Sequence, residues 1–473
     1  MLDTSLIVMV VILALVFDFI NGFHDTANAI ATCVSTRAIR PGVAIVGTAI
    51  LNFLGAMIST GVAKTIGGDI VISPTLVNEM IIIAGLVGAI IWNLLTWWVG
   101  MPSSSSHALI GGMIGAIIVS AGVAALNGWG ILKIVLSLII SPVSAIITGF
   151  IIMVVVLALV FDFINGFHDT ANAIATCVST RAIRPGVAIV GTAILNFLGA
   201  MISTGVAKTI GGDIVVSPTL VNEMIIIAGL VGAIIWNLLT WWVGMPSSSS
   251  HALIGGMIGA IIVSAGVAAL NGWGILKIVL SLIISPVSAI ITGFIIMKII
   301  FAVCHSFKPA KVNLAANRLQ VVSAALMAFS HGSNDAPKAM GIIALALLSG
   351  GYIETMEIPI WVKMACATSM ALGTSAGGWR IISTMGTKIF KMESINGFAA
   401  DLNSSIVIFT ATFLHLPVST THVVSGSIMG IGSAERVRAV HWGVARSMLV
   451  AWVVTIPISA VMSAIIFKII DFL

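Results

Sequence analysis

Three stretches of this sequence place a carboxylate in a polar segment behind an apolar one. GFHDTANAI occurs twice, and GSNDAPKAM further along the chain aligns with it, so Asp25, Asp169 and Asp335 are equivalent. A carboxylate inside an apolar span costs about 2.5–3.5 kcal/mol on insertion scales, and residues that carry such a cost usually have a function. Carboxylate, amide and hydroxyl oxygens suit a small hard cation such as Na+. We therefore predict a cation-coupling site formed by Asp169, Thr170, Asn172 and Asp335.

A second motif, rich in hydroxyl groups, indicates an anion site. MPSSSSHALIGG occurs twice, and LPVSTTHVVSG near the C-terminus matches it. Each copy precedes a glycine-rich apolar segment and predicts a helix start, where free N–H groups, the helix dipole and hydroxyls can hold an oxyanion. N-capping alone explains one Ser or Thr, but not a repeated cluster. We predict that two such helix starts enter from opposite sides and meet near the midplane. The candidate donors are Ser247, Ser248, Ser249, Ser250, Ser419, Thr420 and Thr421.

Histidines accompany both motifs. These histidines could relay protons, because the unperturbed pKa of histidine lies near neutrality, or they could be hydrogen-bonded packing residues. They are His24, His168, His251, His331 and His422, and we favour His168, His251 and His422 as the relay. Lys338 stands where the first motif has Asn172. It could attract an anion or extend its amine to the outer interface.

The elements that must position these side chains are apolar helices. Of the 473 residues, 59% are hydrophobic and only 8% are charged, whereas soluble proteins are about 25% charged. Apolar stretches long enough to cross a bilayer recur throughout the chain, which predicts an all-α polytopic membrane protein. The first apolar run predicts a transmembrane helix rather than a signal peptide. The small excess of positive charge lies in loops and indicates membrane topology, not nucleic-acid binding. The four cysteines suggest neither disulfides nor a metal site.

A segment of the N-terminal part of the sequence occurs twice in tandem. Residues 9–153 and 153–297 differ at two positions, Ile12 against Val156 and Ile72 against Val216. Such near-identity indicates a recent duplication, an engineered sequence or an assembly artefact, because ancient repeats are only weakly similar. We divide the chain into copy A (1–152), copy B (153–304) and a C-terminal half (305–473). Copy A duplicates the candidate site residues as Asp25, Asn28, Ser103, Ser104, Ser105 and Ser106.

Copy B and the C-terminal half share the two motifs in the same order, so they predict two homologous halves. Five spans per half would invert the second half relative to the first, as in many secondary transporters. The positive-inside rule places the alternate basic loops in the cytoplasm and agrees with this inversion. The predicted spans are 151–167, 185–207, 223–243, 250–269, 275–304, 319–333, 358–376, 402–416, 421–433 and 442–470.

Two further features bear on the number and continuity of the spans. Residues 131–167 contain no polar loop, so we predict one long or kinked span there and about fourteen spans in total. The polar stretch HDTANAIATCVST, which starts at His168, predicts a broken or re-entrant helix that lines a cavity.

Taken together, the motifs resemble those of the PiT family of inorganic phosphate transporters in a short bacterial form. The resemblance covers residues 153–473, and copy A repeats its first half. It implies inverted repeats, phosphate as substrate and coupling to Na+ or H+. The family's Asp corresponds to Asp169 and Asp335, and its Asn to Asn172 and Asn334, the latter expected at the substrate. Its Ser/Thr-His motif corresponds to Ser247 through His251 and Ser419 through His422. Lys338 departs from the family's motif.

The sequence thus favours a cation-coupled phosphate symporter in the cytoplasmic membrane that works by alternating access, with no cofactor and no resident metal. A sulfate permease of the same fold is the first alternative, since hydroxyl-rich helix starts suit either oxyanion. An anion channel or a non-functional duplication product is also compatible with the sequence. An intramembrane hydrolase is disfavoured, because the clustered serines lack a defined nucleophile and oxyanion geometry.

Overall fold

A computed structural model describes residues 4–58, 68–377, 385 and 388–472, without the side chains of Ala27, Asn28 and Ile58. These residues are almost entirely helical. Extended backbone pairs only in isolated bridges among them, Val71 with Leu126 and Val215 with Leu270. The all-α architecture predicted from the sequence is therefore confirmed.

The chain divides into two compact units, Met1–Ala145 and Ile146–Leu473. Helix α6 (Gly128–Ser179) crosses the boundary without a loop and contains Pro142, so the junction is one helix, as predicted. The first unit also contains α1 (Thr4–Ser35), α2 (Pro41–Ile58), α4 (Glu79–Val99) and α5 (Ser105–Ala121).

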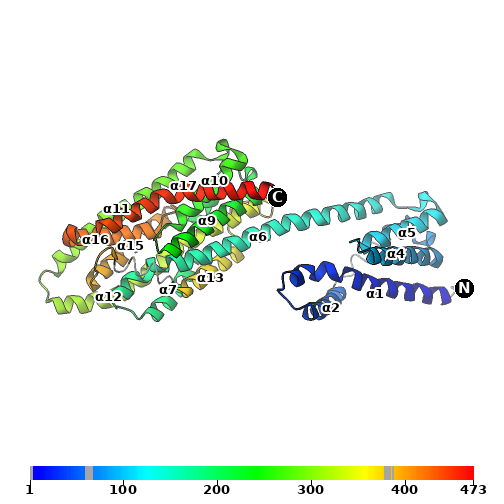
Figure 1. Ribbon diagram of the computed structural model, residues 1–473, viewed down its shortest axis with the longest axis horizontal. Coiled ribbons are helices and arrows are strands. Elements are labelled where there is room, and N and C mark those ends of the chain that lie inside the picture. The colour runs from blue at the N-terminus through cyan, green and yellow to red at the C-terminus, as the bar shows by residue number, and fades with distance from the viewer. Residues whose placement is uncertain (1–3, 59–67, 378–384, 386–387, 473) are drawn as a thin grey trace. The chain divides into compact units, whose positions relative to one another are not determined.

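The second unit contains copy B and the C-terminal half (Figure 1). After α6, the helices of copy B are α7 (Pro185–Ile202), α8 (Gly205–Gly212), α9 (Glu223–Val243), α10 (Ser249–Ala265) and α11 (Gly272–Cys304). The C-terminal half contributes α12 (Pro309–Ser349), α13 (Ile360–Ala376), α15 (Ser394–Phe413), α16 (Thr420–Arg436) and α17 (Trp442–Phe472).

Within the described residues, eight helices are long and apolar enough to cross a membrane, and three shorter apolar helices accompany them. The protein is therefore a multi-pass membrane protein. The total of about fourteen spans stays a prediction.

The two halves of the second unit exchange equivalent contacts. Helix α10 of copy B packs against α17, the last helix of the C-terminal half, and α16 packs against α11, the last helix of copy B. The first helices do the same through glycines. A Cβ atom on Gly166 of α6 would lie 2.3 Å from the carbonyl oxygen of Met370 in α13, and one on Gly332 of α12 would lie 2.1 Å from that of Asn196 in α7. Small residues at these crossings let the helix backbones approach closely.

The core of the second unit consists of two apolar clusters, and the polar motifs lie between them. Along α6, Phe161 belongs to the first cluster and Ile174 to the second; along α12, Ala328 belongs to the second cluster and Ile343 to the first. The equivalent helices α6 and α12 therefore run in opposite directions between the clusters.

The predicted break behind Gly166 is wrong, because the polar stretch is helical and continues α6 to Ser179. The predicted span 319–333 is likewise too short, since α12 continues through the GSNDAPKAM motif and includes Pro337. A continuous helix satisfies its own backbone hydrogen bonds where no water is present, and the polar side chains find partners on facing helices.

Candidate functional site

The site is built where α10 and α16 begin, in buried surroundings. The Ser248 hydroxyl caps α10 by accepting a hydrogen bond from the His251 N–H at 3.2 Å, and Ser419 caps α16 by accepting one from the His422 N–H at 3.3 Å. The centroids of the two histidine rings are 4.5 Å apart. The two helix starts therefore meet, as the motifs predicted.

Asp169 on α6 is buried between these helix starts and is only 2% exposed. One carboxylate oxygen accepts a hydrogen bond from Ser249 at 2.6 Å; the other accepts one from Thr421 at 3.2 Å and lies 2.9 Å from Nδ1 of His168. The donors come from both halves of the unit. Asp169 thus links the two helix starts.

Asp335 on α12 occupies the equivalent position in the C-terminal half and is 1% exposed. One oxygen forms an ion pair with Lys338. The other accepts a hydrogen bond from Thr420 at 2.9 Å and lies 3.3 Å from Nε2 of His331. Two carboxylates, one per half, therefore lie beside two hydroxyl-bearing helix starts.

The residue three positions after each acid reaches the opposite half. The Asn172 amide donates to the Thr421 hydroxyl at 2.9 Å, and the Lys338 ammonium donates to the Ser250 hydroxyl at 2.5 Å. Each acid accepts a hydrogen bond from the helix start of its own half, Asp169 accepts a second one from Thr421 of the other half, and each following residue donates to the helix start of the other half. The two halves thus build one site with matching contacts.

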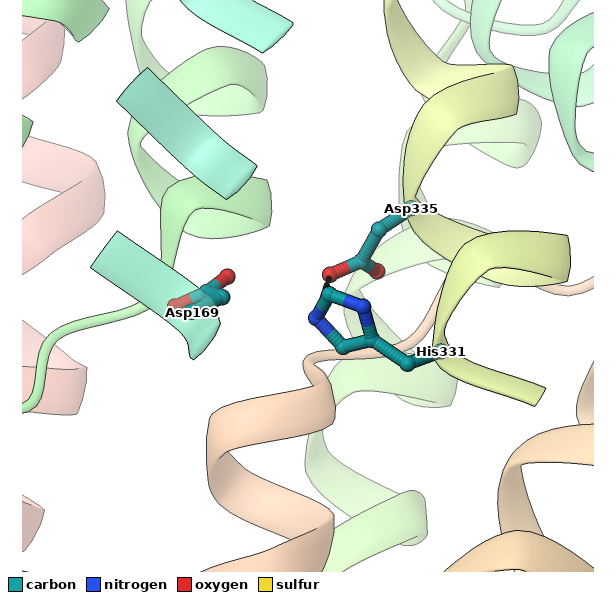
Figure 2. Close-up of side chains that lie close together, drawn as sticks. All are labelled: Asp169, His331 and Asp335. Atoms are coloured by element: carbon teal, nitrogen blue, oxygen red, sulfur yellow. Dashed lines mark ion pairs between the residues drawn. The ribbon is translucent and has the colours of Figure 1, made fainter. Parts of the chain in front are cut away.

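Three of these side chains can share a cation. Ligand atoms of Asp169, His331 and Asp335 all lie within 4.8 Å of one another, and Figure 2 shows them converging from α6 and α12. The Asn172 side-chain oxygen is buried and has no hydrogen-bond partner among the described residues. The carboxylate oxygens of this group suit a hard cation such as Na+, and the third ligand atom is a nitrogen of His331.

Comparison with known proteins identifies the family. The sequence profile of the phosphate transporter family matches residues 21–163 and 165–463. The chain belongs to the phosphate transporter family. The two matched segments separate just before GFHDTANAI recurs, which agrees with a duplicated N-terminal half. As a member of a transporter family, the protein is not an enzyme.

Individual transporters of the family match about two thirds of the chain. A probable low-affinity inorganic phosphate transporter of Bacillus subtilis is 54% identical over 316 residues, or 66% of this chain and 95% of the relative. One of Rhizobium meliloti is 45% identical over 310 residues, covering 65% and 92%. A solved structure described as the sodium-dependent phosphate transporter superposes with a TM-score of 0.64 at 26% identity, covering 69% of this chain and all of that one. A whole relative thus corresponds to a chain without one copy of the repeat.

Three of the residues predicted to bind ions in this family member make hydrogen bonds within the protein, and their role in ion binding stays a prediction. Ser247 donates to Thr240 at 2.7 Å. Thr170 donates to the Gly166 carbonyl at 2.6 Å, so its hydroxyl turns back to its own helix. Asn334 accepts from the Val418 N–H at 3.1 Å and fixes the loop before α16. These residues position the helix starts.

The expectation that Lys338 extends to the outer interface is wrong, because it is 1% exposed and paired with Asp335. Inside the protein the ammonium finds three oxygen partners, on Asp335, Ser250 and Val418, which replace the water it would have at the interface. His251 and His422 lie behind the caps, and the His422 ring stacks on Trp452 at 3.9 Å between centroids. Their role as proton relays stays a prediction.

The sequence predictions named His331 only among the histidines that could relay protons, and they did not name Asn165. His331 precedes Asp335 by four residues and Asn165 precedes Asp169 by four, so each lies one helical turn before its acid. Asn165 accepts from Ser249 at 2.6 Å. If one continuous helix had been predicted through each motif, the spacing of four residues would have placed Asn165 and His331 on the same helix face as the acids.

The first unit repeats part of the site. Ser105 donates to Asp25 at 3.0 Å and Ser103 donates to Thr96 at 2.9 Å. Ser104 caps α5 by accepting from the His107 N–H at 3.3 Å, and Ser106 is the second residue of α5. The side chain of Asn28 lies outside the described residues.

Proposed function

We propose that the protein carries inorganic phosphate across the cytoplasmic membrane together with Na+ or H+, by alternating access. The observation that carries this proposal is the meeting of two hydroxyl-capped helix starts beside the buried acids Asp169 and Asp335. The helix starts supply N–H and O–H donors for an oxyanion. The names of the relatives and of the solved structure agree with phosphate as the substrate.

The position of the acids explains why anion binding requires a cation. Like charges about 4 Å apart repel by about 4 kcal/mol at an effective dielectric constant of 20. Ser249 and Thr420 each have one hydroxyl hydrogen, which a carboxylate accepts. A phosphate that took over either hydrogen bond would lie next to that carboxylate. A cation or proton on the carboxylates removes this repulsion, and the linkage is reciprocal. Coupling therefore follows from the arrangement of the site.

The same acids favour phosphate over sulfate. Phosphate retains a proton near neutral pH and can donate a hydrogen bond to a carboxylate, whereas fully ionised sulfate offers no donor. Asp169 and Asp335 provide such acceptors. Sulfate transport by this site is therefore the weaker alternative.

Burial of the site supports alternating access. The site acids and hydroxyls, including Asp169, Ser250 and Asp335, are at most 3% exposed. A bound ion could leave only after helices move apart. The exchanged packing of α10 on α17 and α16 on α11, together with the opposite directions of α6 and α12, supports an inverted repeat that rocks around one site.

The test is phosphate uptake by the full chain in proteoliposomes, with imposed Na+ or proton gradients and with excess sulfate as competitor. We expect uptake to depend on one of the gradients, to resist sulfate and to disappear in Asp169→Asn. Uptake that needs no cation gradient would indicate an anion channel. Strong competition by sulfate would favour a sulfate permease.

A further inference from the structure

The site has two equivalent arms, Asp169 with Asn172 on α6 and Asp335 with Lys338 on α12. They differ in charge at one position, where the C-terminal arm has Lys338 and the copy B arm has Asn172. The Lys338 ammonium group contacts three oxygens: a carboxylate oxygen of Asp335, the Ser250 hydroxyl at 2.5 Å and the Val418 carbonyl at 2.8 Å. An ammonium has three N–H donors and no acceptor. All three donors therefore have acceptors within the protein, and none is left for a phosphate ion.

Carboxylate, hydroxyl and carbonyl oxygens, the three that contact Lys338, are also the ligands that a small hard cation prefers. The equivalent side chain in copy B is Asn172, whose amide donates to Thr421 as Lys338 donates to Ser250. Asn172 carries no charge, and its side-chain oxygen has no hydrogen-bond partner among the described residues. The C-terminal arm thus holds a covalently attached cation where the copy B arm offers a neutral oxygen.

The histidines do not account for this difference. His168 lies 2.9 Å from Asp169 and His331 lies 3.3 Å from Asp335, so each acid has one imidazole beside it. With neutral histidines, Asp169, Asp335 and Lys338 together carry one negative charge. Removing the ammonium would leave two, and a buried charge without a partner is strongly disfavoured. Asp162, a further buried acid that interacts electrostatically with Asp335 and Lys338, is present with or without the ammonium and does not change the comparison.

We propose that the Lys338 ammonium takes the place of one exchangeable coupling cation. The site then needs an external cation only at the Asp169 arm, where Asn172 supplies a free oxygen. This proposal rests on the proposed function and specifies its stoichiometry: with Asn at position 338, each phosphate would be accompanied by one more cation.

The experiment measures the net charge carried per phosphate, from the membrane potential at which phosphate flux reverses at fixed pH. The variants are Lys338→Asn, which gives the C-terminal motif the Asn of copy B, and a matched control, Lys277→Asn. Lys277 is 42% exposed and pairs with Asp213 at 3.3 Å. We expect the charge per phosphate to rise by one elementary charge in Lys338→Asn and to stay at the wild-type value in Lys277→Asn. An unchanged charge in an active Lys338→Asn protein would overturn the proposal.

A second measurement decides the matter if Lys338→Asn folds but does not transport. An ion that binds only the native state stabilises it in proportion to the logarithm of its concentration, so the slope counts bound ions. We expect the dependence of thermal stability on Na+ concentration, with choline as replacement, or on pH, to be steeper by about one ion in Lys338→Asn than in the wild type. The proposal would be overturned if the thermal stability of Lys338→Asn depended on Na+ concentration and on pH to the same extent as that of the wild type.

The two proposals fail in distinguishable ways. If no folded variant, the wild type included, takes up phosphate, the proposed function is contradicted, and the slopes of stability still test the role of Lys338. If the wild type shows coupled uptake and Lys338→Asn carries the same charge, only the inference about Lys338 is contradicted.

Discussion

Breaking the buried pair of Asp335 and Lys338 should cost more than removing both charges together. In Asp335→Asn the ammonium keeps its contacts with Ser250 and Val418 but loses the carboxylate with which it forms an ion pair. Removal of one partner of a buried pair costs about 3–5 kcal/mol, whereas replacement of both by neutral groups is often nearly neutral. We therefore expect Asp335→Asn to destabilise the protein by about 3–5 kcal/mol and the double variant with Lys338→Met by about 1 kcal/mol or less.

The assay is a double-mutant cycle on the free energy of unfolding of the purified protein in mixed micelles, without added Na+. The single variant Lys338→Met leaves Asp335 with Thr420 and His331 and completes the cycle. We expect a coupling energy of at least about 2 kcal/mol between the two positions. Effects that add within about 0.5 kcal/mol would refute the assignment of a strong buried pair. The double variant should be folded but inactive in phosphate uptake, because it lacks the second acid.

Two further predictions concern helix packing and the duplicated motif. Gly332→Ala should sharply lower the yield of folded protein in size-exclusion chromatography, because its Cβ atom would lie 2.1 Å from the Asn196 carbonyl oxygen. Gly212→Ala is the control, since a Cβ atom there would have nothing within 4 Å. Equal yields of the two variants would contradict the close packing at Gly332. Ser249→Ala should lower phosphate uptake at least tenfold, since it removes a hydrogen bond to a charged group worth about 1.5–3 kcal/mol. Ser105→Ala should leave uptake unchanged, and an equal loss in both would show that copy A contributes.

The sequence was sufficient to predict the helical membrane fold and the residues that meet. Side-chain chemistry at fixed spacing predicted Asp169, Asp335 and the two helix starts, and the structure brings them into contact. The equivalence of the motifs also predicted that the two halves contribute equivalent residues to one site. What the sequence did not reveal is that each arm donates to the opposite half, as Lys338 does to Ser250, because such contacts depend on tertiary packing.

The errors arose where tertiary contacts override local sequence signals. The polar stretch after Gly166 suggested a broken helix, but several of its side chains donate to facing helices. Thr176, for example, donates to Asp401 at 2.5 Å. For the same reason Lys338 is buried against a carboxylate instead of reaching the interface. Periodicity and polarity along one chain cannot show which side chains a second helix will supply.

Copy A can build only part of a site from its own sequence. Ser105 donates to Asp25 at 3.0 Å within the first unit, as Ser249 donates to Asp169 at 2.6 Å within the second. Thr421, which completes the contacts of Asp169, belongs to a C-terminal half that the chain contains once. We therefore expect a variant lacking residues 9–152 to take up phosphate at the same rate per folded molecule as the full chain. A faster rate in the shortened chain would mean that copy A competes with copy B for the C-terminal half. Loss of uptake would mean that the duplicate is required, contrary to the complete set of contacts within the second unit.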